Sequence, residues 1–174
     1  LMQILGYLLG DGTVKERCVR FKDSDKGTLE AYRELIKKVF NIHGRIVPIT
    51  GVGAWLLEVN SLYLCRWLKE NILSQRDEFL GRLSQLPADE AGAFLRGMFD
   101  AEGCVNLKSG QISFRITDRR LVAVVQILLL RRGIATSFYT ETKNVKNWND
   151  SHGLFLNNLR SFENFSSAIG FTSK

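Results

Sequence analysis

Two acidic residues, Asp11 and Glu102, each precede a glycine at the end of an apolar stretch. A helix is expected to end at each acid–glycine pair, and a helix C-terminus carries roughly half a unit of negative charge. Two carboxylates brought together there would repel each other, so the pattern favours a divalent cation that offsets the repulsion. Bound cations can activate water and stabilise the leaving oxygen in phosphodiester hydrolysis. The pattern therefore indicates metal-dependent hydrolysis of a phosphodiester.

Small residues recur four positions apart just before each acid, as Gly6 and Gly10 in the first segment and as Gly97 and Ala101 in the second. This spacing places them on one helix face, where small side chains let two backbones approach closely. We therefore expect the two helices to pack on each other and to bring the acids side by side.

Further oxygen ligands for a cation lie beside the acids. The last helical carbonyls, those of Gly10 and Ala101, would add to a set of the kind that Mg²⁺ prefers. Gly12 and Gly103 would turn the chain away from each helix end. One acid–glycine pair is more often only a solvated helix end. Two matched pairs, each followed by a basic alternating strand, favour catalysis.

The chain repeats itself. Segment 5–12 matches segment 96–103, each reading glycine, two apolar residues, one further residue, a small residue, an acid and a glycine. Two later matches follow in the same order, 19–26 with 112–119 and 57–62 with 154–159. The separation grows slowly, from 91 to 97 residues, as small loop insertions would produce. We therefore expect two copies of one fold.

Each half is expected to run helix, strand, strand, helix, strand, strand, helix. The expected strands are 13–17, 19–23, 45–49 and 55–59, then 104–108, 111–117, 136–142 and 154–156. Helix boundaries are expected at the N-cap Asp118, the helix ends Asn41 and Gly133, and the capping pairs 60–61 and 157–158.

A linking helix is expected over 74–86, stopped by Pro87, with Asp89 starting the second motif helix. The polar stretch 144–153 is expected to form a loop tip. The chain then divides into residues 1–86, the first repeat with its linking helix, and residues 87–174, the second repeat.

Composition fits this interpretation. The 174 residues carry a net charge of +6, which favours a polyanionic partner. No run approaches 18 apolar residues, so neither a transmembrane span nor a membrane partner is expected. Three cysteines without paired spacing indicate free thiols in a reducing intracellular compartment, cytoplasm, nucleoid or organelle matrix. Two histidines exclude a zinc cluster built on them.

These motifs resemble those of the LAGLIDADG homing endonucleases, with the signature at 4–12 and 95–103. The resemblance covers nearly the whole chain and implies an α+β fold of two pseudo-symmetric αββαββα repeats, whose paired four-stranded antiparallel sheets form a DNA-binding saddle. It implies a monomer that makes double-strand breaks with 3′ overhangs in a long DNA site. Such enzymes are typically encoded within self-splicing introns or inteins. The resemblance also implies Mg²⁺ as cofactor, Mn²⁺ as a substitute, and Ca²⁺ as an ion that binds without cleavage.

Site residues are carried over by position. The resemblance makes Asp11 and Glu102 the metal-binding acids. It makes Asp25 and Asp118 the residues that position water, and Arg76 and Lys174 the basic residues near the scissile phosphate. The signature departs from the common pattern at Leu9, where an acid is usual and Asp100 keeps it, and at Glu102, which replaces the commoner aspartate.

The alternating strands also predict a DNA-binding face. Basic and polar side chains on it would contact guanine edges or phosphates. The predicted contacts are Lys15, Arg17, Arg20, Lys22, Arg45, Asn106, Lys108, Gln111, Ser113, Arg115, Tyr139, Lys143 and Lys146. Because the two halves differ at most of these positions, we expect a non-palindromic target.

Three alternatives stay open. A maturase of the same fold would bind intron RNA. A regulator would bind DNA without cutting it. The endonuclease part of an intein would lie inside another protein, although no terminal His-Asn splicing segment is present, which favours a free-standing intron product.

Overall fold

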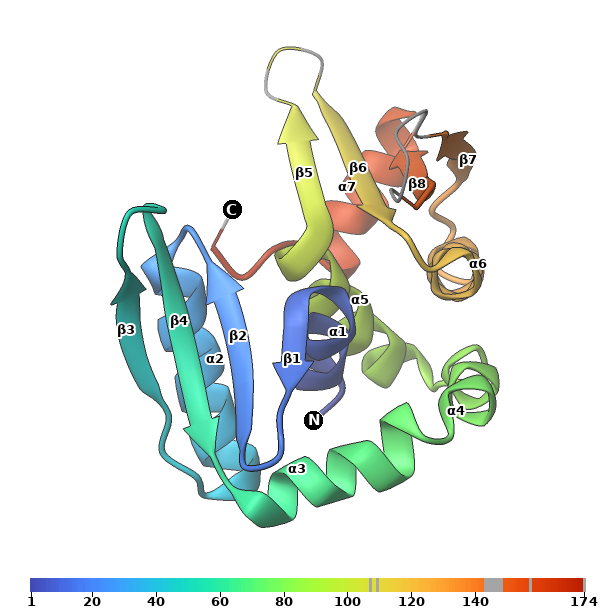
Figure 1. Cartoon of the computed structure of the whole chain (residues 1–174). Coiled ribbons are helices and arrows are strands. Elements are labelled where there is room, and N and C mark those ends of the chain that lie inside the picture. Colours follow the sequence, from blue (N-terminus) through green and yellow to red (C-terminus); the bar gives the residue numbers. More distant parts are fainter. Residues whose placement is uncertain (107, 109, 143–148, 157, 174) are drawn as a thin grey trace.

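The computed structural model describes every residue except 107, 109, 143–148, 157 and 174. Two similar halves flank a central pair of helices (Figure 1). The first half contains α1 (Met2–Asp11), β1 (Gly12–Val14), β2 (Cys18–Asp23), α2 (Lys26–Phe40), β3 (Arg45–Ile49), β4 (Ala54–Asn60) and α3 (Leu62–Leu68). The second contains α5 (Ala88–Glu102), β5 (Gly103–Asn106), β6 (Gln111–Ile116), α6 (Arg119–Leu130), β7 (Thr136–Glu141), β8 (Ser151–Leu156) and α7 (Leu159–Ala168). The predicted order of elements is confirmed.

Both sheets have four antiparallel strands in the same spatial order, β1-β2-β4-β3 and β5-β6-β8-β7. Their registers correspond, since Phe21 pairs with Gly12 and Leu57 in the first sheet as Phe114 pairs with Gly103 and Leu154 in the second. These residues point inward, and the two phenylalanines are each 1% exposed. The α+β architecture of two pseudo-symmetric repeats is therefore confirmed.

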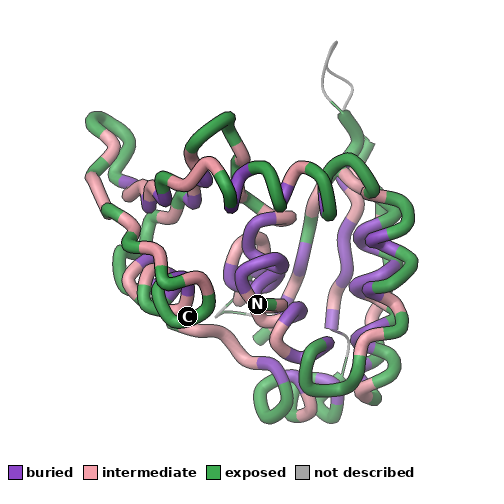
Figure 2. The backbone as a smooth tube through the Cα atoms, turned by 90° about the horizontal axis from the view of Figure 1, so that it is seen from below, coloured by how far each residue is buried: buried purple, intermediate pink, exposed green. Residues whose placement is uncertain are grey.

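Helices cover only the inner face of each sheet. In the tube coloured by burial, the buried segments face the interior and the exposed ones line the outer helix faces and the loops (Figure 2). The core is continuous across both halves and includes the largest buried rings, among them Tyr7, Tyr32, Phe94 and Phe99. The two repeats therefore share one core.

The central helices α1 and α5 touch along their backbones. A Cβ atom built on Gly97 would lie 2.0 Å from the carbonyl oxygen of Gln3, and one built on Gly6 would lie 2.2 Å from that of Phe94. Neither position has room for a side chain. The close approach expected from the small residues is present, and glycine is what permits it.

Side-chain caps fix the starts of four helices. Asp25 accepts hydrogen bonds from the backbone N–H groups of Gly27 and Thr28, and Asp118 accepts them from two residues of α6. Ser61 and Asn158 cap the two closing helices in the same way. Asn41 and Gly133 have φ angles of 54° and 69°, as the expected helix ends require.

Several boundaries differ from expectation. Strand β1 ends at Val14 because the N–H of Lys15 donates to the carbonyl of Cys18, closing a tight hairpin turn. Lys15 and Arg17 therefore lie in the turn rather than on a strand. Strand β8 begins at Ser151, which pairs with Glu141, so the predicted loop was three residues too long at its end.

The linker and the second motif helix also differ. In place of one helix over 74–86, α3 continues into a π-helical turn, η1 (Lys69–Leu73), followed by α4 (Arg76–Leu83). Helix α5 starts at Ala88 after Pro87, whose carbonyl accepts from the N–H of Ala91. Asp89 therefore lies in the first turn, where its charge suits the helix dipole, and is not the cap.

Candidate active site

The two acids are the last residues of the two central helices, Asp11 in α1 and Glu102 in α5. A Cβ built on Gly10 would lie 2.6 Å from Cβ of Ala101 and 3.2 Å from Cγ of Glu102. The side chain of Glu102 therefore lies against the residue that precedes Asp11. The structure brings the two acid-bearing helix ends together.

The glycines after the acids have a steric role. Gly12 and Gly103 have extended backbones, with φ of −86° and −79°, so the expected turn through a left-handed helix cap is absent. A Cβ on Gly12 would lie 2.6 Å from the carbonyl oxygen of Leu8, and one on Gly103 would lie 2.4 Å from that of Phe99. Glycine is needed at both positions because the first residue of each strand lies directly against the last turn of the preceding helix.

Asp11 lies beside one basic residue, Lys22, and one acidic residue, Asp23. Burial raises the pKa of Asp11, Lys22 lowers it and Asp23 raises it. The hydroxyl of Tyr7 donates to Asp23 at 2.6 Å and lies 3.1 Å from the carbonyl oxygen of Lys22. Burial and then the hydrogen bond with Asp23 raise the pKa of Tyr7, which keeps its hydroxyl protonated as the donor. Sequence reasoning missed Asp23, whose only signal was its place at the end of β2.

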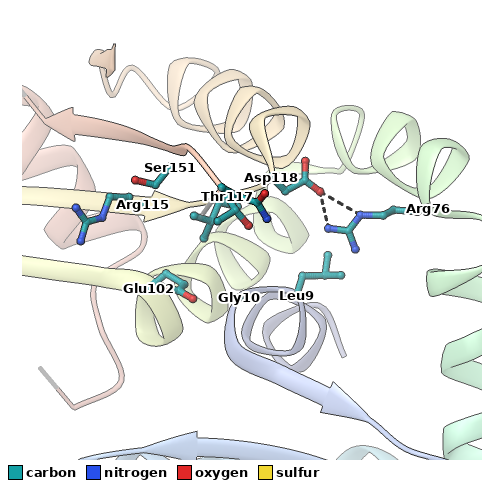
Figure 3. Close-up of a pocket in the computed structure, with 10 residues that line it drawn as sticks. Leu9, Gly10, Arg76, Glu102, Arg115, Thr117, Asp118 and Ser151 are labelled. Atoms are coloured by element: carbon teal, nitrogen blue, oxygen red, sulfur yellow. Dashed lines mark hydrogen bonds and ion pairs between the residues drawn. The ribbon is translucent and has the colours of Figure 1, made fainter. Parts of the chain in front are cut away.

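Glu102 opens onto a hollow of about 660 Å³. Figure 3 shows Arg76 and Asp118 joined by two hydrogen bonds on one side of this hollow, with Glu102 on another. The lining residues are Leu9, Gly10, Arg76, Glu102, Arg115, Ile116, Thr117, Asp118, Asn149 and Ser151. Two basic side chains, Arg76 and Arg115, and two acids of the predicted site, Glu102 and Asp118, thus face a single space.

Asp25 and Asp118 hold equivalent places in the two halves. Burial would raise the pKa of Asp118, but hydrogen bonds from Arg76 and from backbone amides outweigh it and keep the pKa below its usual range. Hydrogen bonds from Ser173, Thr28 and the amide of Gly27 lower the pKa of Asp25. Both carboxylates are already engaged as helix caps, and their roles with water stay a prediction.

Each of these aspartates is contacted from the other repeat. Arg76 follows the closing helix of the first half and reaches Asp118 in the second. Ser173 follows the closing helix of the second half and contacts Thr28 and Asp25 in the first. Arg76 and Ser173 are 97 residues apart, the same separation as the matching closing helices. Lys174, predicted near the phosphate, lies outside the described residues.

The donor set suits a hard cation. Asp11 and Glu102 supply carboxylate oxygens, and Gly10 and Ala101 supply backbone carbonyls, which is the chemistry that Mg²⁺ and Mn²⁺ accept. Within the described ranges, no group of three or more His, Cys, Asp or Glu side chains could hold a metal ion. Any cation there would need water and substrate phosphate to complete its coordination.

Each sheet also has an outer face on which no described helix packs (Figure 1). On this face, residues of three neighbouring strands pair in two rows, across β2-β4-β3 in the first sheet and β6-β8-β7 in the second. The first outer row is Arg20–Glu58–Arg45 in one sheet and Ser113–Phe155–Ser137 in the other. The second outer row is Lys22–Leu56–Val47 in one and Arg115–Gly153–Tyr139 in the other.

Most predicted DNA contacts lie on or beside these rows. Arg20, Lys22 and Arg45 belong to the first sheet, and Ser113, Arg115 and Tyr139 to the second. Asn106 and Gln111 pair with each other next to the turn of the β5–β6 hairpin, and Lys108 lies in this turn. Lys143 and Lys146 lie outside the described residues. Glu58, Phe155 and Gly153 lie in the same rows but were not among the predicted contacts, because an acid, an apolar ring and a glycine do not donate hydrogen bonds to bases or phosphates from their side chains.

Comparison with known families accounts for both halves. The family model of the LAGLIDADG-like domain matches residues 1–72 and 89–170. The chain belongs to the LAGLIDADG family. The two matched stretches each contain one acid-bearing helix and one sheet, so the LAGLIDADG repeat is present twice.

Relatives and solved structures agree with this membership. Over 183 aligned positions the LAGLIDADG chain is 40% identical to glutamine–fructose-6-phosphate aminotransferase [isomerizing] of Methanocaldococcus jannaschii, with all of the chain but 16% of that protein covered. The chain thus spans about a sixth of this relative's length. The crystal structure of I-DmoI in complex with DNA and Mn superposes with a TM-score of 0.70 at 17% identity, over 99% of this chain and 96% of the other. The N-terminal LAGLIDADG domain of DUF199/WhiA superposes with a TM-score of 0.71 at 15% identity, over 99% and 81%.

The LAGLIDADG motifs of the two halves differ at their first acid position. Asp100 is 1% exposed and accepts hydrogen bonds from the hydroxyl of Tyr32 and from both the amide and the hydroxyl of Thr172. It thereby fastens the segment after α7 to the first repeat. Leu9, at the matching position, lines the hollow instead. Asp100 is therefore a buried residue that holds elements together, and it does not face the hollow.

In the described part of this LAGLIDADG protein, no helix is both long and apolar enough to cross a membrane.

Proposed function

We propose that this LAGLIDADG protein is a DNA endonuclease that cuts both strands of a long, non-palindromic duplex site as a single chain, leaving 3′ overhangs. The observation that carries the proposal is the meeting of two acid-bearing helix ends, made possible by glycine-to-backbone contact between α1 and α5. Such a costly pairing of like charges has no evident benefit for stability alone.

Different residues of the chain would bind cations and balance the charge of the phosphate. Asp11 and Glu102, with the carbonyls of Gly10 and Ala101, would hold divalent cations, Mg²⁺ or Mn²⁺. When bound, such ions supply an activated water and charge stabilisation at the phosphate. Lys22 beside Asp11 and Arg115 beside Glu102 balance the charge of an incoming phosphate in the two halves.

Asp25 and Asp118 hold the start of the helix next to each acid, and Arg76 closes one wall of the hollow. In this arrangement the two caps keep the surrounding polar groups fixed, which lowers the cost of organising water around a substrate. The solved complex of I-DmoI with DNA and Mn supports DNA as the substrate class.

The best test compares two acid variants with a matched control. Asp11→Asn and Glu102→Gln should each reduce double-strand cleavage on the order of 10³-fold, because each removes a cation ligand. DNA binding measured in Ca²⁺ should change little. Asp89→Asn, an exposed acid in the first turn of α5, should leave both unchanged. Cleavage at the original rate by either acid variant would refute the two-acid mechanism.

The chain covers only a small share of the aminotransferase relative, and this favours one of the alternative origins of the gene, an insert in a host protein. All of the LAGLIDADG chain matches only 16% of a protein that is named for unrelated chemistry. Such a match is what an insert carried inside a host protein would give. We therefore favour an intein-type insert over a free-standing intron product, with the same nuclease activity.

The two settings differ in the messenger RNA. An intron product is removed from the mature host transcript, whereas a protein insert remains in frame in that transcript and is lost only after translation. Reverse-transcription sequencing across the host junctions distinguishes them. A mature transcript that lacks the coding segment would contradict the insert.

A further inference from the structure

The outer face of the second sheet carries a stacked pair of aromatic rings, which we call the aromatic platform, formed by Tyr139 and Phe155. Their ring centroids are 4.3 Å apart and the ring planes differ by 11°, so the rings are stacked. The two residues lie on neighbouring strands and on the same face, one row apart. Phe155 is flanked across the strands by Ser113 and Ser137, whose short side chains leave its ring standing above them.

Gly153 makes the platform possible. It pairs with Tyr139, and a Cβ built on it would lie 2.4 Å from Cζ and 2.5 Å from the hydroxyl oxygen of that tyrosine. The phenol ring therefore lies over the backbone of β8, where any other residue would push it away. With a φ outside the left-handed region, Gly153 is explained by the space the ring needs and not by backbone strain.

Charged groups border the platform on one side. Arg115 pairs with Gly153 on its other edge and forms an ion pair with Glu141, the next residue but one after Tyr139. The helices of this half, α6 and α7, lie on the opposite, inner face of the sheet (Figure 1). Two half-buried aromatic rings thus lie beside an arginine, on the face predicted to meet DNA.

We infer that the aromatic platform reads the 5-methyl group of thymine in the major groove of the second half-site. The inference rests on the proposed function, which places duplex DNA against this face. Among the base edges of the major groove, thymine alone offers an apolar group. The amino groups and ring nitrogens of the other bases would lose hydrogen bonds to water against ring faces that cannot replace them.

The first sheet has no such surface at the matching positions. Where the second sheet has Phe155 and Tyr139, the first has Glu58 and Val47. Glu58 accepts from both Arg20 and Arg45, so this row is fully charged. Thymine reading by aromatic contact is therefore confined to one half of the target, which gives the site its polarity.

The test begins with a target selected from a randomised duplex library by binding in Ca²⁺. Each thymine of that target is then replaced by uracil, which removes only the methyl group. At one or two positions in the half contacted by the second repeat, the replacement should weaken binding about fourfold, as expected for losing one buried methyl group. Thymines in the other half should tolerate it.

Variants assign the effect to the platform. Tyr139→Val, which introduces the residue of the first sheet, and Gly153→Ala should each bind the thymine and uracil targets equally well. Tyr139→Phe keeps the ring and should retain the fourfold difference. Binding that ignores every methyl group in this half, or a methyl effect that survives Tyr139→Val, would overturn the inference.

The same target separates this inference from the proposed function. Cleavage in Mg²⁺ tests the nuclease, while uracil discrimination in Ca²⁺ tests the platform. A protein that binds and discriminates but never cuts would refute only the nuclease. A protein that cuts but does not discriminate would refute only the platform. If no sequence were selected at all, both would fall.

Discussion

The two sheets have the same strand order and corresponding registers, but their outer faces have opposite chemistry. In the first outer row, one sheet has two arginines clamped by Glu58 and the other has a phenylalanine between two serines. The inner faces agree, with Phe21 and Phe114 each 1% exposed at matching positions. Packing restricts the inner residues of both repeats in the same way, while the outer residues are free to match two different halves of a partner.

The contacts between the repeats show a similar contrast. Arg76 reaches Asp118 through an ion pair, and at the matching place the hydroxyl of Ser173 contacts Asp25 and Thr28. Each half thus contacts the capping aspartate of the other half, but only the contact of Arg76 with Asp118 is an ion pair. The comparison therefore separates a shared framework, set by backbone contact and caps, from side chains that distinguish the halves.

Breaking the shared framework should have the largest effect. Gly97→Ala places a methyl group where a Cβ lies 2.0 Å from the carbonyl oxygen of Gln3, so α1 and α5 must move apart. We expect a loss of about 3 kcal/mol in the free energy of unfolding, measured by urea denaturation.

Gly81→Ala is the matched control, because a Cβ there meets nothing within 4 Å and the residue lies inside α4. It should raise stability by roughly 0.5–1 kcal/mol. If both alanine variants behaved alike, the central helices would not be held by backbone contact.

The buried acid of the second motif comes next. Asp100→Asn replaces one carboxylate oxygen with an NH₂ group. The hydroxyl of Tyr32 and the amide and hydroxyl of Thr172 donate to the two carboxylate oxygens, so at least one of these three donors loses its acceptor. We expect a loss of about 2 kcal/mol in stability. The matching change Leu9→Asn, on the rim of the hollow, should cost less than about 1 kcal/mol. Equal losses would show that the two motif positions are equivalent.

The charged row of the first sheet can be altered without changing its size. Glu58→Gln removes the negative charge that holds Arg20 and Arg45. Both arginines then become available to phosphates, so non-specific DNA affinity should rise and the slope of log K against log salt should steepen by about 1. An unchanged slope in a salt titration would mean that this row does not meet DNA.

The smallest effect concerns pH. Because the folded-state pKa of Asp118 is lowered, its contribution to stability is present above the unfolded pKa, about 3.9, and is lost as pH falls through the folded value. Arg76→Met should lower stability at pH 7 by about 0.5 kcal/mol and make the acid-side loss shallower. Arg120→Met, which breaks a more exposed pair with Asp77, should change neither. Denaturation at pH 7 and pH 3 compares the three proteins.

Sequence periodicity was sufficient for the order of elements, and local chemistry was sufficient for the caps at Asp118, Ser61 and Asn158. These features depend on residues close together in the chain. Strand ends were less predictable, as at Val14, because a hairpin closes where backbone hydrogen bonds allow and not where apolar alternation stops.

The acid pair was predictable because the small residues before Asp11 and Glu102 already indicated helix contact. The surroundings of the site were not. The bonds of Asp23 to Tyr7 and of Asp100 to Thr172 join elements that only the tertiary fold brings together. The need for glycine at position 153 could not be predicted either, because it comes from the ring of Tyr139, 14 positions earlier in the chain.

The hydrogen bond between Gln3 and Thr172, 3.0 Å long, has a consequence for how the two repeats stay together. Thr172 also donates to Asp100 of α5 through its amide and its hydroxyl, so the segment after α7 bridges the two central helices. Damage to this bridge should therefore loosen the seam between the repeats as well as the segment itself.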